Sequence, residues 1–259
     1  MATMKDEAVL PVLFAGHGSP MNAIENNPWS ETWERIGMSI PRPDVIIAVS
    51  AHWCTDGQKV RTAPDNPQIY DMYGFPPELY ELKYAPAGHP AFAEKIEHLT
   101  GAEADNSHGI DHGVWSVLCR MFPNADIPVV MMSTDVTASP EKLYETGKRM
   151  RELRKDGALI VASGNVVHNL ALCDYRKECG YGWTDKFDSL VKDIMLSKDR
   201  MRITEYEELP YAERAAESDE HFRPLVYAAG ASDENDYVEV WNDDRTLGAL
   251  SMTSYTFRR

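Results

Sequence analysis

Strand-like apolar runs, with helical stretches between several of them, are the feature that most constrains the fold of this chain. They cover Val9 to Ala15, Val45 to Ser50, Ile127 to Met132, Ala158 to Ala162 and Tyr237 to Trp241. This alternation is typical of α/β layering, in which helices cover a mostly buried sheet. We therefore predict an α/β fold with a central, mostly buried mixed sheet flanked by helices.

The clearest helix is predicted from about Pro140 to Lys155. Ser139 is its candidate N-cap, Pro140 suits its first position and Gly157 follows its end. Further helices are expected near Ala91 to Leu99, Val114 to Met121, Lys186 to Leu196 and Asp219 to Ala229. The Pro-rich, aromatic segment from Pro64 to Pro90 shows neither the hydrophobic period of a helix nor that of a strand for long. This indicates an ordered loop, and loops of that length are usually functional.

Length and composition favour one domain over residues 1–259, because 259 residues that are 43% hydrophobic can form one sizeable core. The first apolar run, of about eight residues, is too short for a signal sequence or a membrane span. The net charge of −15 argues against nucleic acid as a partner. The chain has four cysteines, which are Cys54, Cys119, Cys173 and Cys179. They form no CxxC pair, which suits a reducing compartment and therefore a cytoplasmic protein.

Five histidines lie near the ends of predicted elements. His17 and His52 each follow an apolar strand, and the crevice beyond the carboxyl ends of strands is where α/β proteins bind ligands. His168 follows another strand after a short turn, His112 lies in a turn that opens a helix, and His221 lies in the first turn of another helix. A single histidine in such a position is as often a half-buried polar residue as a functional one. The repeated placement at element ends favours a shared site.

Neutral imidazole is the commonest metal ligand, and a set of three suits iron, zinc, copper or nickel. The spacing does not choose among these metals, and the chain has no HExxH, EF-hand or CxxC motif. Ser19 and Ser163 are weak candidates for a nucleophile because neither lies in a GxSxG elbow. Gly16 and Gly18 are instead expected to let the backbone turn tightly beside His17.

Seven motifs in order carry a resemblance that spans nearly the whole chain. The sequence resembles the class III extradiol ring-cleavage dioxygenases of the LigB superfamily, in the branch of the 4,5-DOPA extradiol dioxygenases. The motifs are GHGSPMNAIENN, SAHW, YDMYGFPPELYELKYAPAGHP, DHGVWSVLCRMFPNADIPVV, SGNVVHNL, EHFRPL and SMTSYTF.

The resemblance implies a non-haem Fe(II) held by His17, His52 and His221, and it implies that His168 is the acid/base. His112 would line the same pocket. Relatives outside this branch have a glutamate as third ligand, so Glu220 is the reserve candidate. A shell of neutral histidines should also bind Zn(II), so zinc is a second expected occupant of the site in purified protein.

Substrate contacts are expected from Tyr73 and Phe75 of the aromatic loop and from Ser19 of the GHGSP motif. For the aromatic residues, including Tyr80, the alternative is that they anchor the loop to the core. Tyr70 stands where histidine is expected in many relatives, a departure that would alter substrate contacts.

A substrate carboxylate has three unranked candidate partners, which are Lys83, Arg61 and Arg223. The expected activity is the opening of a catechol-type ring with dioxygen, with a small-molecule catechol and O2 as partners. Two alternatives stay open: a hydrolase in which three histidines on zinc activate water, and a non-enzymatic Memo-type binding protein. No feature of the sequence specifies an oligomeric state.

Overall fold

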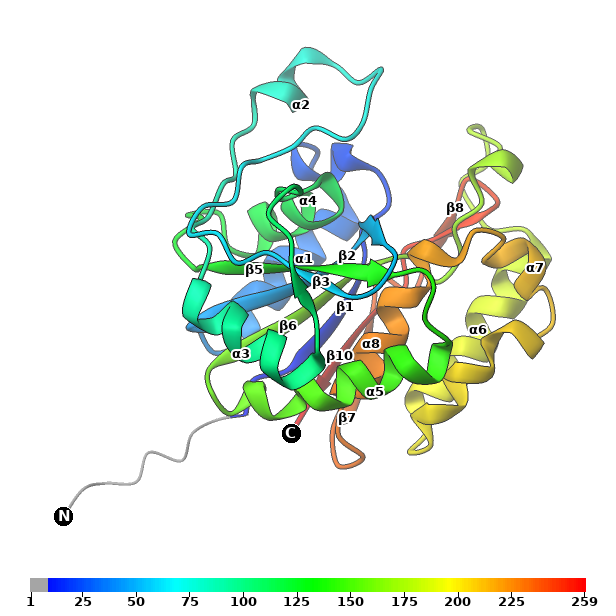
Figure 1. Ribbon diagram of the computed structural model, residues 1–259. Coiled ribbons are helices and arrows are strands. Elements are labelled where there is room, and N and C mark those ends of the chain that lie inside the picture. Colours follow the sequence, from blue (N-terminus) through cyan, green and yellow to red (C-terminus); the bar gives the residue numbers. More distant parts are fainter. Residues whose placement is uncertain (1–8) are drawn as a thin grey trace.

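The computed structural model describes residues 9–259 and has an eight-stranded sheet at its centre (Figure 1). The strand order is β4-β3-β5-β2-β6-β1-β10-β7, and β8 and β9 form a separate two-stranded sheet. The strands are β1 (Val12–Gly16), β2 (Val45–Thr55), β3 (Lys59–Val60), β4 (Glu103–Ala104), β5 (Val129–Asp135), β6 (Ala158–Gly164), β7 (Tyr237–Trp241), β8 (Arg245–Thr246), β9 (Leu250–Ser251) and β10 (Ser254–Arg258).

The sheet is mixed, as predicted. Strands β5, β2, β6 and β1 run parallel at its centre, whereas β10 pairs antiparallel with β1 and with β7. On the other side, β3 is antiparallel to β5. The central strands are apolar on both faces, which explains why they stand out in the sequence as continuous hydrophobic runs.

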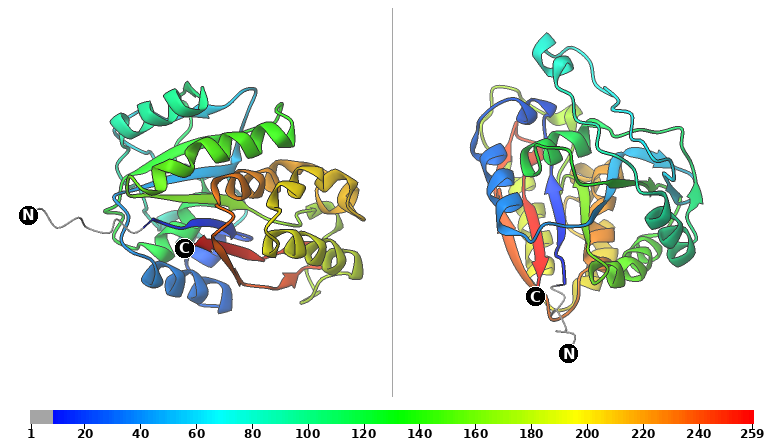
Figure 2. Two further views of the ribbon diagram at one scale, coloured as in Figure 1. Left: turned by 90° about the horizontal axis from the view of Figure 1, so that it is seen from below. Right: turned by 90° about the vertical axis from the view of Figure 1, so that its left-hand side faces the viewer.

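Helices cover both faces of the sheet (Figure 2). Residues of α1 and α4 share one hydrophobic core with Leu13 and Ile46, and residues of α3, α5, α6 and α8 share the other with Phe14 and Ile47. The helices are α1 (Pro28–Ser39), α2 (Pro77–Glu81), α3 (Pro90–Thr100), α4 (His112–Met121), α5 (Pro140–Met150), α6 (Gly182–Leu196), α7 (Ala212–Ala215) and α8 (Arg223–Ala231).

The predicted elements are present, with changed limits. Helix α5 begins at Pro140 under the Ser139 cap but gives way after Met150 to a 3-10 helix, η2 (Arg151–Arg154). Strand β10 was not predicted. It is buried between β1 and β7, but Ser254 and Thr256 interrupt its apolar pattern. Both hydroxyls are satisfied, since one accepts from the backbone N–H of Gly16 and the other from the indole of Trp241.

The segment from residue 64 to 90 is an ordered loop, as predicted, with the short helix α2 in the part that projects from the sheet (Figure 1). Its base is tied to the rest of the molecule. Asn66 Nδ2 donates to the carbonyl of Val129 at 2.8 Å, and Trp115 Nε1 donates to the carbonyl of Ile69 at 2.9 Å. Among residues 9–259 no helix is long and apolar enough to cross a membrane, and the four cysteines are unpaired.

Candidate metal centre

Neighbouring parallel strands bring three histidines to one edge of the sheet. His17 directly follows β1, His52 lies in β2, and His168 lies shortly after β6. Because β1 and β2 both pair in parallel with β6, their carboxyl ends meet at the same edge. The structure thus groups three histidines that are far apart in the sequence.

The position of His52 corrects the expectation that it follows its strand. β2 continues to Thr55, and its pairing with β5 shifts register between Val49 and Cys54. Irregular pairing of this kind redirects side chains, as β-bulges beside active sites do. His52 lies inside the shifted stretch.

The other two histidines come from helix beginnings. His112 is the first residue of α4, whose N-cap Asp111 accepts from the backbone N–H of Val114 and from the Ser50 hydroxyl. His221 ends a 3-10 helix, η5 (Asp219–His221), and α8 starts at Arg223. The helix predicted from Asp219 is therefore two elements with His221 at their junction.

Two glycines allow the histidines to approach the scaffold. A Cβ atom at Gly164 would lie 2.1 Å from the carbonyl oxygen of His221, which is also the acceptor for Asn165 N–H at 2.8 Å. A Cβ atom at Gly113 would lie 2.7 Å from His52 Cδ2. A larger residue at either position would displace a histidine.

The rings of His17, His52 and His221 form a nearly equilateral triangle. Their centroids are 5.0 Å apart for His17 and His52, 4.9 Å for His52 and His221, and 5.3 Å for His17 and His221. The ring of His112 lies 4.0 Å from that of His52 and 5.8 Å from that of His17. His168 stacks on His221 at 3.6 Å with an 8° angle between the rings. All five histidines thus form one cluster.

Two groups within this cluster have ligand atoms close enough to share an ion. Nitrogens of His17, His52 and His112 lie within 4.8 Å of one another, and so do ligand atoms of His168, Glu220 and His221.

Hydrogen bonds at Nδ1 define which ring nitrogen of His17 and His221 is free. His17 Nδ1 lies 2.9 Å from Ser163 Oγ, and since that hydroxyl donates to the carbonyl of Gly113, it accepts from the imidazole. His221 Nδ1 lies 3.1 Å from Glu220 Oε1. A neutral imidazole carries one N–H, so Nε2 of each ring is an unprotonated potential ligand.

Asp71 has the same role for two rings. Its Oδ2 lies 3.0 Å from His112 Nδ1 and 3.3 Å from His52 Nδ1. Burial acts to raise the pKa of Asp71, but the hydrogen bonds and charge of His112 lower it to about 2, so the group is an ionised acceptor. The sequence does not reveal this role of Asp71, because no local pattern marks a contact made across the fold.

The free nitrogens of His17 and His52 face each other, with their Nε2 atoms 3.1 Å apart. If both protons are on Nδ1, no hydrogen bond joins these atoms and the two lone pairs repel. Two nitrogens bound to one ion at about 2.1 Å and about 90–110° lie about 3.0–3.4 Å apart. These residues therefore fit a divalent metal such as iron or zinc.

Burial keeps these histidines neutral. Burial and the neighbouring histidines lower the pKa of His17 and of His221 well below the usual 6.5. The same causes lower the pKa of His52 and bring that of His168 to about 4. Neutral imidazole is the form that binds metals, so the cluster is ready to bind a cation at pH 7.

Comparison with known families gives a match to the catalytic LigB subunit of aromatic ring-opening dioxygenases over residues 12–258. The chain belongs to the LigB family. The resemblance drawn from the sequence motifs is thereby confirmed, as is the α/β fold with its mixed sheet.

Relatives of this LigB chain are similar along almost its whole length. It is 36% identical to a 4,5-DOPA dioxygenase extradiol of Escherichia coli K12, covering 95% of this chain and 93% of that protein. A Beta vulgaris protein of the same name is 32% identical, with 97% and 98% covered. The crystal structure of an uncharacterised E. coli K12 protein superposes with a TM-score of 0.84 at 33% identity, covering 95% of this chain and 99% of that one.

The residues of this LigB chain that were predicted to contact the substrate differ in their environments. Tyr73 is 92% exposed, and Phe75 packs at the edge of the hydrophobic core of α1 and α4. Ser19 Oγ accepts from the backbone N–H of Met21 and so caps a 3-10 helix, η1 (Pro20–Ala23). The Tyr70 hydroxyl donates to the carbonyl of Leu82.

Two of the three cations considered for a substrate carboxylate are held by the scaffold. Arg61 Nη1 donates to the carbonyls of Asn106 and His108, and its Nε donates to the carbonyl of Asp65. Arg223 donates to Asp219 Oδ1 at 2.7 Å and to the carbonyl of Ala138 at 2.8 Å. Lys83 Nζ donates a hydrogen bond to the Tyr70 hydroxyl oxygen at 2.8 Å, and both residues lie on the aromatic loop.

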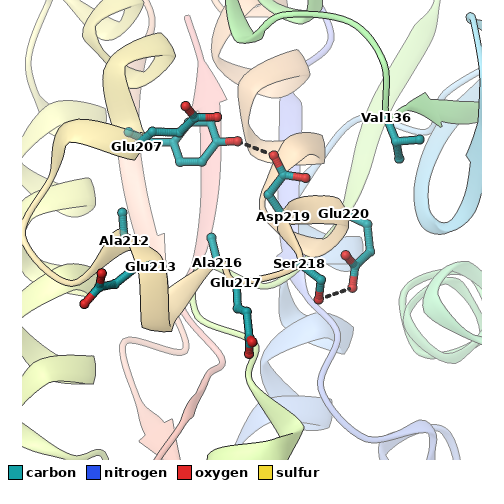
Figure 3. Close-up of a pocket in the computed structure, with 10 residues that line it drawn as sticks. Val136, Glu207, Ala212, Glu213, Ala216, Glu217, Ser218, Asp219 and Glu220 are labelled. Atoms are coloured by element: carbon teal, nitrogen blue, oxygen red, sulfur yellow. Dashed lines mark hydrogen bonds between the residues drawn. The ribbon is translucent and has the colours of Figure 1, made fainter.

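A cavity of about 560 Å³ opens beside η5 (Figure 3). Figure 3 shows Glu220 on its wall, with Ser218 donating to it, and Glu220 in turn contacts His221. None of the five clustered histidines lines this cavity, and its walls carry several carboxylates and no basic side chain. The cavity therefore lies beside the histidine cluster, and the carboxylates of its walls would repel a substrate carboxylate.

Proposed function

We propose that this chain is an extradiol dioxygenase that opens a catechol-type aromatic ring with dioxygen at a non-haem Fe(II). His17, His52 and His221 would hold the metal, His168 would act as the acid/base, and His112 would contact the substrate. Membership of the LigB family and relatives named as extradiol dioxygenases support this proposal.

The observation that carries the ligand assignment is the triangle of three rings, each with Nδ1 on a hydrogen-bond acceptor. Its sides of 4.9–5.3 Å are nearly equal, which suits three ligands on one side of an ion. His112 lies at unequal distances from His17 and His52, which favours a substrate contact. Glu220 lies on the Nδ1 side of His221, which favours a supporting role for it rather than that of a ligand.

Iron(II) bound there would supply coordination positions for both reactants and the redox chemistry that allows dioxygen to attack the ring. The neutral ring of His168 would accept a proton from a catechol hydroxyl and return it to an oxygen of the product. With Nδ1 on Asp71, His112 would accept a hydrogen bond at Nε2 from the second hydroxyl and orient the ring. The product would be a ring-opened semialdehyde that contains both oxygen atoms of O2.

Oxygen uptake after anaerobic loading of metal-free protein with Fe(II) tests this function, with absorbance followed in the near-UV and visible. The panel is DOPA, caffeate and protocatechuate, and the zinc-loaded protein is the control because zinc has no redox chemistry. We expect stoichiometric oxygen consumption and a yellow product with at least one catechol. No uptake with any catechol by iron-loaded protein would contradict the proposal and favour zinc hydrolysis or binding.

The ligand set is tested by His17→Ala, His52→Ala and His221→Ala, each of which should sharply lower metal occupancy measured by elemental analysis. His98→Ala is the matched control, because His98 is an exposed histidine on α3. Unchanged occupancy in any one of the three variants would remove that residue from the set.

A further inference from the structure

Asp71 differs from the other polar groups around the cluster because its carboxylate contacts two histidines at once. Ser163 and Glu220 each contact one ring, whereas Asp71 Oδ2 lies 3.0 Å from His112 Nδ1 and 3.3 Å from His52 Nδ1. Its other oxygen accepts the backbone N–H of His112 at 2.9 Å. That N–H is in the first turn of α4, where backbone donors have no partner within the helix.

An ionised carboxylate attracts N–H protons and repels nitrogen lone pairs, so the nitrogen that faces it in each of the two histidines is the protonated one. Each ring is then protonated at Nδ1, and each Nε2 has a free lone pair. For His52 this is the nitrogen that faces His17 Nε2 at 3.1 Å. One carboxylate therefore selects the tautomer of both rings.

Asp71 lies on the long loop of residues 64–90, and not on a strand of the sheet or a helix that covers it. The base of this loop is held independently of the carboxylate. The backbone N–H of Ile69 donates to the carbonyl of Ile110 at 3.0 Å, and Trp115 Nε1 donates to the carbonyl of Ile69 at 2.9 Å. Removing the charge of Asp71 should therefore leave the loop attached.

We propose that Asp71 is a positioning residue that fixes His52 as a ligand through Nε2 and, at the same time, fixes His112 as an acceptor for the substrate hydroxyl. This inference rests on the proposed function and assigns to the aromatic loop a part in forming the metal centre. Asparagine at this position would present one oxygen and an NH2 group. If that oxygen accepts from the backbone N–H of His112, the NH2 group faces both Nδ1 atoms and favours the opposite tautomer of the two rings.

The test compares Asp71→Asn with Glu78→Gln, which removes an equal charge from an exposed position on α2 of the same loop. Zinc affinity is measured by competition with a chromophoric chelator. The tautomer of His112 is read from long-range ¹H–¹⁵N spectra of the zinc-loaded protein. A purely structural role for Asp71 would not change that tautomer.

In the wild type and in Glu78→Gln we expect His112 to be protonated at Nδ1. In Asp71→Asn we expect protonation at Nε2 and a zinc affinity about 10–100-fold lower. An Nε2–H tautomer of His112 in the wild type would overturn the inference, and so would equal zinc affinity in the two variants. Neither measurement uses dioxygen or a catechol, so a failure of the dioxygenase proposal would be seen separately in the uptake assay.

Discussion

At the scale of single residues, the cluster depends on groups that hold four of its imidazoles, those of His17, His52, His112 and His221, in one tautomer. Ser163 is an example, because its hydroxyl accepts from His17 Nδ1 and donates to the carbonyl of Gly113. Ser163→Ala should lower metal affinity by about 10–100-fold, since His17 would lose the partner that directs Nε2 toward the site. Ser116→Ala is the matched control, because Ser116 is fully buried on α4 and its hydroxyl has no hydrogen-bond partner. Equal metal affinity in the two variants, measured by chelator competition, would contradict this role.

At the scale of elements, the site requires the end of β6 to lie against η5. Gly164 allows this contact, since a Cβ atom there would lie 2.1 Å from the carbonyl of His221. Gly164→Ala should lower the free energy of unfolding by about 1–3 kcal/mol and weaken metal binding, because η5 and His221 must move. Gly182→Ala, at the start of α6 with open space around it, should change stability by less than about 0.5 kcal/mol. Urea unfolding and metal titration check both variants, and normal metal binding by Gly164→Ala would show that His221 does not need this close approach.

At the scale of the whole molecule, a buried ion pair joins parts of the chain that are remote in sequence. Arg154 and Asp236 are almost inaccessible and form two contacts, at 2.7 and 3.2 Å, while Arg154 also donates to the carbonyls of Leu10 and Ala231. Arg154→Met should therefore lower the free energy of unfolding by about 3–5 kcal/mol, because it leaves Asp236 as an uncompensated buried charge.

Urea unfolding measures this loss, and Arg149→Met, at an exposed position of α5, is the control. The double variant with Asp236→Asn should recover part of the stability, since the unpaired charge is then removed. A loss below about 1 kcal/mol in Arg154→Met would show that the pair does not stabilise the fold.

The sequence by itself determined the fold class, the main strands and helices, and the family. Periodicity and capping residues are local properties, so β7 and the start of α5 agree with their predictions. The motifs also marked the five histidines, because each lies beside an element end that local patterns reveal. That these five form one cluster was expected from their places at the ends of elements and from the resemblance, and the structure brings them together.

Only the tertiary structure decided which groups support the histidines. His17 and Ser163 are 146 positions apart, and Asp71 is 41 positions from His112. Contacts over such separations depend on strand order and loop path, which no local period encodes. For the same reason β10 was missed, since its Ser254 and Thr256 hydroxyls accept hydrogen bonds from the neighbouring strands β1 and β7. Polar residues of this kind look like surface in the sequence and become core only when their partners are in place.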